Sequence, residues 1–208
     1  MSLAGLFLIT FLVVHLTINI LILFDDTREL FNQAAHFMLT NPLIQTFQWV
    51  LFAGFIIHII LGFVLQIQNW IARPMRYERK GFSETSYFSK FMIHTGVIVL
   101  IFLGLHFANF FFKVKFGPIE MIAYESGVYK DVGALVVALF KDIWYVIFYI
   151  ISLLLLGFHL QHGFQSAFQS LGLNHKTYTP AIKLIGNIYS VLVTAGYLAI
   201  PIVIYFFK

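Results

Sequence analysis

The sequence has no cysteine and few charged residues, and both absences limit what the protein can be. Without thiolates the chain cannot attach haem covalently through a C-x-x-C-H motif, ligate an iron-sulfur cluster or form a disulfide. Charged residues make up only 11% of the 208 residues, against about 25% in an average soluble domain. Hydrophobic residues make up 60%. The composition therefore predicts an integral membrane protein in which any redox chemistry uses a non-covalent cofactor.

The remaining charge favours a lipid surface over nucleic acid. The formal net charge is +4, and the sequence has no dense basic stripe with interleaved aromatic residues. Such a stripe is the usual electrostatic footprint of a nucleic-acid-binding protein. We therefore expect no nucleic-acid partner, and we expect the positive charge to lie against anionic lipid head groups.

Long apolar runs divide the chain into five segments. They fall at roughly 3–24, 45–72, 88–113, 141–171 and 181–207, and each is long enough to cross about 30 Å of hydrocarbon. The first run is too long for a signal peptide and lacks a small-residue cleavage site, so we expect it to remain as a helix. Breaks between runs occur at Asn41-Pro42, Arg73-Pro74, Gly117-Pro118 and Thr179-Pro180. The sequence therefore predicts an all-α integral membrane protein, a five-transmembrane-helix bundle that forms one domain over residues 1–208.

The loops predict the orientation of this bundle, because short loops rich in Lys and Arg stay in the cytoplasm. The connection after residue 72 contains Arg73, Arg76, Arg79 and Lys80. The connection after residue 24 has only Arg28, next to Asp25, Asp26 and Glu29. We therefore expect the N-terminus inside and, after five spans, the C-terminus outside.

Four of the eight histidines, His15, His58, His106 and His159, lie inside four different apolar runs. An ionisable side chain is costly in hydrocarbon and is usually present for function. The neutral imidazole is a common iron ligand, and a helical bundle can hold a cofactor between ligands on facing helices. The four histidines thus predict two bis-histidine haems and membrane electron transfer. A proton-coupled transporter or channel with a histidine relay is the alternative from a different class, and it predicts no haem absorption.

The depth of each histidine sorts the four into two pairs. Counted from the outer helix ends, His15 and His106 lie about nine and seven residues in, at about 1.5 Å per residue. His58 and His159 lie about thirteen and eighteen residues in by the same count. The sequence therefore predicts an outer pair, His15 with His106, and an inner pair, His58 with His159, roughly 10 Å apart in depth.

Glycines on the same helix faces as two of these histidines are compatible with a porphyrin. Gly54 and Gly62 lie four residues on either side of His58, and Gly163 lies four residues after His159. Their missing side chains would allow a flat ring to lie close to the backbone. They could equally be the small residues through which membrane helices approach one another.

The remaining histidines are weaker candidates. His162 follows His159 by three residues and faces nearly the same way, so the residues alone leave the ligand ambiguous between them. His94 lies near the inner end of the third run, His36 in the outer loop and His175 in the inner loop. We expect these side chains to be hydrogen-bonded or solvated, while His36 and His94 are also candidates for contact with a quinone or a haem propionate.

Three stretches around the histidines resemble a known family. They read A-G-L-F-L-I-T-F-L-V-V-H up to His15, T-G-V-I-V-L-I-F-L-G-L-H up to His106, and H-L-Q-H-G-F-Q-S-A-F-Q-S-L-G from His159 to Gly172. Over essentially its whole length the chain is similar to the dihaem cytochrome b membrane anchor of succinate:quinone oxidoreductases, the succinate dehydrogenase and fumarate reductase family. In that family the ligand is followed by glycine four and thirteen residues later, and this spacing selects His159 over His162.

The resemblance implies cofactors, partners and a location. It implies two haem b groups, with His58 and His159 on one and His15 and His106 on the other. A separate flavoprotein subunit would oxidise succinate, an iron-sulfur subunit would pass the electrons on, and a quinone, menaquinone in particular, would be reduced in a bacterial cytoplasmic membrane. The chain itself would perform no dicarboxylate chemistry. The basic segment from Arg73 to Lys80 would dock the iron-sulfur subunit or bind anionic lipid.

The chain also departs from this family. Some members have Arg and Lys after the fourth-helix ligand to hold haem propionates, where this chain has Gln165, Ser166, Gln169 and Ser170. Related fumarate reductases have a glutamate in that helix, but no acid follows Asp142 in the 141–171 run. Dihaem anchors of nitrate reductase, formate dehydrogenase or hydrogenase therefore remain an alternative.

The expected quinone site lies at the outer end of the helix that carries His15. The loop after that helix places Asp25, Asp26, Arg28 and His36 there. We expect His36 to relay protons to the quinone, because imidazole titrates near neutral pH. An inner site near His94 is the alternative.

Overall fold

The structure is a computed structural model that describes residues 1–72 and 92–208. The basic segment Arg73, Arg76, Arg79 and Lys80, expected to stay in the cytoplasm and to dock a partner, lies outside the described residues. The same is true of the Arg73-Pro74 break and of the first residues of the run expected from 88.

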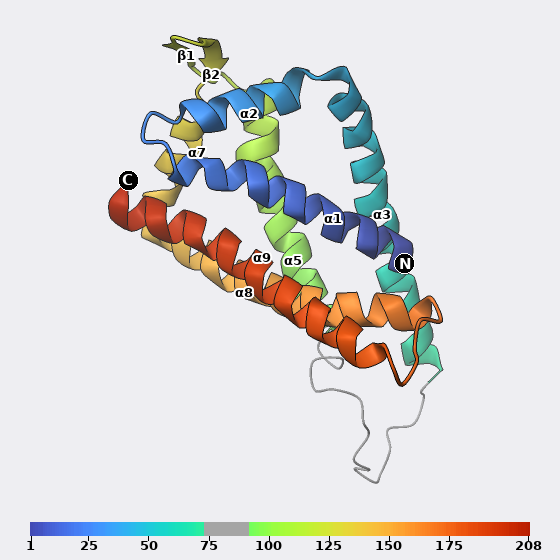
Figure 1. The fold of residues 1–208 in the computed structure, drawn as a ribbon. Helices are drawn as coiled ribbons and strands as arrows, with labels where there is room; N and C mark the ends of the chain where they lie inside the picture. The colour runs from blue at the N-terminus through green and yellow to red at the C-terminus, as the bar shows by residue number, and fades with distance from the viewer. Residues whose placement is uncertain (73–91) are drawn as a thin grey trace.

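Five long apolar helical segments make up most of the described chain (Figure 1). They are Ser2–Leu23 (α1, Ser2–Asn19, continued by the 3-10 turn η1, Ile20–Leu23), Pro42–Ile71 (α3), Met92–Phe116, Ile143–Ser170 (α8) and Thr179–Phe207 (α9). The third segment consists of α5 (Met92–His106), the π-helical turn η2 (Phe107–Phe111) and α6 (Phe112–Phe116). Each segment has the length and hydropathy of a membrane span. The predicted runs are therefore confirmed in number and place, and the protein is a multi-pass membrane protein.

Two long helices begin at the proline-containing breaks that the sequence analysis identified, Asn41-Pro42 and Thr179-Pro180. Asn41 caps α3, because its side chain accepts hydrogen bonds from the N–H groups of Leu43 and Ile44 at 2.9 and 3.3 Å. Asp142 caps α8 in the same way. Pro180 lies in the first turn of α9, where its missing N–H leaves no hydrogen bond unmade.

The segments between spans are more structured than the sequence indicated. The expected loop after the first span contains α2 (Glu29–Thr40), so His36 lies on a helix rather than in a loop. The long connection before α8 contains an antiparallel hairpin of β1 (Met121–Tyr124) and β2 (Gly127–Lys130), followed by α7 (Val132–Phe140). The fold is thus mostly helical, and the short β1–β2 hairpin is an element that the sequence analysis did not predict.

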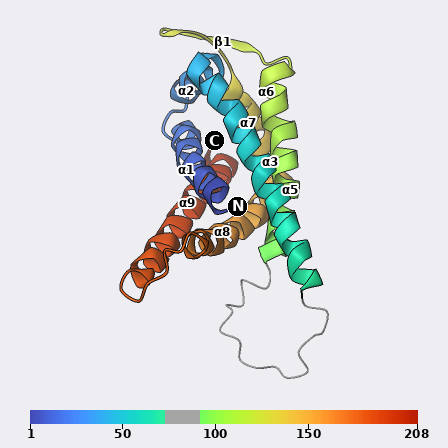
Figure 2. The same cartoon turned by 90° about the vertical axis from the view of Figure 1, so that its right-hand side faces the viewer.

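These extra elements gather at one end of the bundle, which we call the hairpin end (Figures 1 and 2). The C-terminus belongs to the same end, since Lys208 Nζ pairs with Asp26 at 2.8 Å. The N-terminus belongs to the opposite end, because the Ser2 hydroxyl is hydrogen-bonded to Ser170 at the close of α8. The two termini therefore lie on opposite sides, as an odd number of spans requires.

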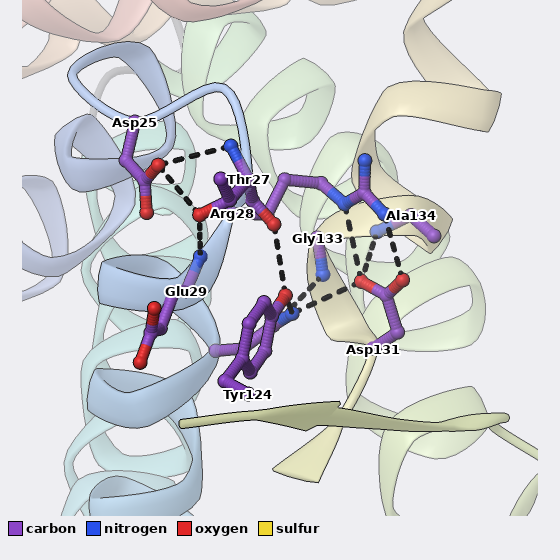
Figure 3. A network of polar contacts seen from close by, with 9 residues as sticks. Asp25, Thr27, Arg28, Glu29, Tyr124, Asp131, Gly133 and Ala134 are labelled. Carbon is purple, nitrogen blue, oxygen red and sulfur yellow. Dashed lines mark hydrogen bonds and ion pairs between the residues drawn. The ribbon is translucent and has the colours of Figure 1, made fainter. Parts of the chain in front are cut away.

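A partly buried polar network holds the hairpin end together (Figure 3). Arg28 forms hydrogen bonds with Asp131 through Nε and Nη2, at 3.2 and 2.9 Å. Asn32, which is fully buried, donates to Asp131 and Tyr124 and accepts from the N–H of Gly133. These bonds join the turn before α2 to the hairpin and to α7, elements about a hundred residues away in the chain.

Helix α8 packs against α9, α5 and α1, while α3 packs against α1 and α2. Figure 1 shows α8 and α9 side by side. Trp49 and Trp144 lie toward the hairpin end and Trp70 toward the other, and their side chains are 70%, 76% and 64% exposed. Tryptophans at both ends of the spans are typical of the two membrane interfaces.

Candidate functional site

Two histidine pairs lie between the helices. His15 of α1 faces His106 at the end of α5, with ring centroids 5.7 Å apart and an interplanar angle of 86°. His58 of α3 faces His159 of α8, with centroids 6.2 Å apart at 75°. The structure therefore brings together the two pairs that the depth count predicted.

The two pairs lie in separate layers along the helices. The pair nearer the hairpin end is His15 with His106. On α1, His15 follows Gly5 by ten residues, and on α5, His106 follows Gly96 by ten residues. Both glycines lie beside the other histidine pair. On α8, Tyr149 contacts His106 of the first pair. His159, a member of the second pair, follows Tyr149 by ten residues on the same helix. Ten helical residues span about 15 Å. Three helices thus give the same separation between layers, somewhat more than the depth count suggested.

The separations between the rings fit a metal held by both members of a pair. Metal–imidazole bonds of about 2.0 Å, with roughly 1 Å from nitrogen to ring centre, would put the centres of two ligating imidazoles about 5–6 Å apart, depending on the angle at the metal. The observed centroid separations of 5.7 and 6.2 Å are close to this range. Within residues 1–72 and 92–208, no group of three or more His, Cys, Asp or Glu side chains could hold a metal ion. A haem iron would need only two side chains from the protein, because the porphyrin would supply its other nitrogen ligands.

Aromatic rings surround the pair nearer the hairpin end. His15 stacks on Phe11 at 5.2 Å and lies 6.1 Å from Tyr197. His106 lies 5.2 Å from Phe110 and 5.8 Å from Phe102. This apolar surrounding suits a flat hydrophobic cofactor and excludes water from the imidazoles.

The other pair carries an unmatched polar atom. His58 Nδ1 is buried, and within the described residues no group forms a hydrogen bond with it. Most buried polar atoms in folded proteins have a partner, because leaving one without a partner costs free energy. A group bound between His58 and His159 that contacts this nitrogen would remove the cost.

Glycines from neighbouring helices approach the two rings of this pair. A Cβ at Gly5 of α1 would lie 3.6 Å from His58 Cε1, and a Cβ at Gly96 of α5 would lie 3.5 Å from His159 Cε1. Together with the unmatched nitrogen, these close approaches fit a group held at the pair.

Gly5 and Gly96 were not among the predicted site residues, although a signal for them exists. Each is followed ten residues later by a paired histidine, His15 and His106 respectively, so the two helices share one Gly-to-His spacing. The predicted glycines have other neighbours. A Cβ at Gly54 would lie 3.1 Å from Phe7. A Cβ at Gly62 would lie 3.8 Å from Met1, and a Cβ at Gly163 would lie 3.7 Å from Met92. Gly54, Gly62 and Gly163 therefore allow side chains of other helices to approach.

Hydroxyl groups contact one histidine of each pair, and no sequence pattern pointed to them. Tyr149 Oη lies 3.2 Å from His106 Nδ1, and Thr95 Oγ1 lies 3.4 Å from His159 Nδ1. On α1, the Asn19 amide lies 3.3 and 3.4 Å from the two ring nitrogens of His15 and donates to its backbone oxygen at 2.7 Å.

The remaining candidates are not members of the two pairs. His162 is half-buried on α8, one turn beyond His159, and His94 is exposed near the start of α5. His36 is exposed on α2, with its ring 5.2 Å from that of Tyr129. His175 is exposed in the turn between α8 and α9 and stacks on Tyr178.

The charged residues expected around His36 are engaged elsewhere. Asp25 accepts hydrogen bonds from Thr27 and from the N–H of Leu30. The Thr27 hydroxyl and then the Leu30 N–H hold the pKa of Asp25 below its ordinary value. Asp26 pairs with Lys208 and Arg28 with Asp131. These contacts fix the turn between η1 and α2, and the expected role of these side chains at a quinone stays a prediction.

No protein-family model matches the chain, and no curated protein or solved structure is significantly similar to it. The structural findings define a multi-pass membrane protein with two layers of paired histidines between its helices.

Proposed function

We propose that this chain is a dihaem cytochrome b that anchors a succinate dehydrogenase or fumarate reductase complex in the membrane. Its function would be to pass electrons between an iron-sulfur subunit and a quinone. The observation that carries this proposal is the placement of four intramembrane histidines as two facing pairs, with ring centroids 5.7 and 6.2 Å apart.

The residues that would hold the cofactors are His15 with His106 and His58 with His159. Haem iron supplies one-electron redox chemistry when it is bound by two imidazoles. The chain's own contribution is to hold each imidazole between helices and to keep water from the layers. His15 is held by Phe11 and Asn19, His106 by Phe110 and Tyr149, and His159 by Thr95.

The resemblance to the succinate:quinone oxidoreductase family supports the choice of complex. It implies the flavoprotein and iron-sulfur partners, menaquinone as acceptor and the bacterial cytoplasmic membrane. The proposed N-terminus on the inner side rests instead on the Lys- and Arg-rich segment after residue 72. The geometry of the two histidine pairs by itself is equally compatible with an anchor of a nitrate reductase, formate dehydrogenase or hydrogenase. The identity of the co-purified subunits separates these possibilities.

The test is a reduced-minus-oxidised visible spectrum of the purified protein, with haem quantified per polypeptide. We expect two b-type haems per chain, and succinate-dependent quinone reduction by the complex purified with its partner subunits. A haem ratio near zero would overturn the redox proposal and favour a histidine relay for protons. Two haems together with partner subunits that do not act on succinate would support a dihaem cytochrome b but assign it to a different respiratory complex.

A further inference from the structure

The antiparallel helices α5 and α8 each place a hydroxyl group against the paired histidine of the other. Tyr149 of α8 lies 3.2 Å from His106 Nδ1, and Thr95 of α5 lies 3.4 Å from His159 Nδ1. Thr95 precedes His106 by eleven residues, and Tyr149 precedes His159 by ten. The two contacts are therefore reciprocal, and one belongs to each histidine layer.

The contact at His159 has a defined direction. The Thr95 hydroxyl donates its hydrogen to the backbone oxygen of Met92 at 3.0 Å, so its oxygen is left to accept. The His159 Nδ1 nitrogen then carries the hydrogen and donates it to Thr95. In a neutral imidazole the other nitrogen, Nε2, consequently bears the lone pair that can bind a metal.

The contact at His106 belongs to a longer hydrogen-bonded chain. Tyr149 is buried, and its hydroxyl oxygen accepts a hydrogen bond from Tyr145 at 3.1 Å. His106 directly precedes η2, a π-helical turn, and such turns are frequent at functional sites.

We infer that Tyr149 and Thr95 are positioning residues that fix the Nδ1 nitrogens of His106 and His159 and leave Nε2 of each for iron. This inference rests on the proposed function. Metal-ligating histidines usually donate their second ring N–H to an acceptor, which fixes the ring and raises the basicity of the ligand. A more basic ligand favours ferric over ferrous iron. Loss of either hydroxyl therefore raises the midpoint potential of one haem only.

The test uses the purified holoprotein with Tyr149→Phe and Thr95→Val, each of which removes a hydroxyl and keeps most of the side-chain volume. Tyr189→Phe and Thr10→Val are matched controls, because their hydroxyls bond to backbone oxygens of α1, at Ile9 and Leu6, instead of a ring nitrogen. The readouts are haem content, the low-spin electron paramagnetic resonance signals and an optical redox titration that resolves the two haems.

We expect Tyr149→Phe to raise the potential of the haem at His15 and His106, and Thr95→Val to raise that of the haem at His58 and His159. Thr95→Ser, which restores a hydroxyl, should return the potential toward the parent value, and the controls should leave both potentials unchanged. Unchanged potentials in Tyr149→Phe and Thr95→Val, or a shift of the same haem by both, would overturn the inference. Loss of both haems from either variant would also overturn it, because the hydroxyl would then support the whole bundle.

The proposed function and this inference fail in different ways. A parent protein without haem removes both. If the parent protein holds two haems and their midpoint potentials do not change in Tyr149→Phe and Thr95→Val, the cytochrome b proposal stands and only the positioning role is disproved.

Discussion

Gly96 of α5 lies so close to His159 of α8 that a Cβ on the glycine would be 3.5 Å from the imidazole Cε1. Gly5 of α1 has the same relation to His58, at 3.6 Å. Two helices thus approach the two members of one histidine pair through glycine. Both distances are ordinary van der Waals contacts, so a methyl group fits there and a larger side chain displaces the ring.

A size series at these glycines should therefore affect one haem. We expect Gly5→Ala and Gly96→Ala to keep two haems, and Gly5→Leu and Gly96→Leu to lose the haem at His58 and His159, because overpacking moves the imidazole. Haem quantification and redox titration measure the result. Gly104→Leu on α5 is the matched control, since nothing lies within 4 Å of a Cβ there. The prediction is wrong if the two Leu variants lose different haems or if Gly104→Leu loses one.

Single histidine substitutions should separate His159 from His162. His159→Ala removes one member of a facing pair, so we expect it to lose the haem at His58 and His159 or to leave it high-spin. His162→Ala removes a half-buried neighbour one turn away and should keep two low-spin haems. Visible and electron paramagnetic resonance spectra distinguish the two results. The reverse pattern would assign the ligand to His162 and contradict the pairing seen between His58 and His159.

The role expected for His36 can be tested against quinone turnover. We expect His36→Ala to slow quinone reduction while electrons still reach both haems, because only the proton supply would be lost. His175→Ala is the control, as it removes another exposed histidine at the opposite end of the bundle. Turnover is followed from about pH 6 to about pH 8. Parent-like turnover in His36→Ala over that range would remove His36 from the mechanism and leave its contact with Tyr129 as its role.

The network around Asp131 should make stability depend on pH. Burial raises the pKa of Asp131. The hydrogen bonds from Arg28, Asn32 and the Ala134 N–H together lower the pKa by more than burial raises it, so the pKa of Asp131 lies below the ordinary 3.8. A carboxylate with a depressed folded pKa stabilises the fold above its unfolded pKa, and this contribution is lost as the pH falls through the folded value. Asp131→Asn, which replaces the charged acceptor, should therefore lower the free energy of unfolding by about 1–3 kcal/mol near neutral pH.

Thermal unfolding in detergent, followed by tryptophan fluorescence, measures this effect. The Tm difference between the parent and Asp131→Asn should be constant from about pH 5 to about pH 7 and shrink below about pH 4. Asp26→Asn is the control, because the Asp26 side chain is 96% exposed and its pair with Lys208 should contribute little. A Tm difference that persists undiminished at about pH 3 would contradict the assignment to the Asp131 carboxylate.

The sequence predicted the spans because their signal is local. About twenty consecutive apolar residues suffice to define a membrane helix, and the caps at Asn41 and Asp142 act on the next few N–H groups. The facing histidines were also predictable, since depth in a span follows from residue number. Elements outside the membrane were missed, because α2 and the β1–β2 hairpin depend on distant contacts such as Arg28 with Asp131.

The surroundings of the histidines were decided by the tertiary structure alone. The sequence determined that His15, His58, His106 and His159 lie in the membrane and at which depth, because helical rise is fixed. Which face of one helix meets which face of the next depends on packing between segments far apart in the chain. That packing placed Gly5 and Gly96, rather than Gly54 and Gly163, against the imidazoles, and it placed Tyr149 and Thr95 at their Nδ1 atoms.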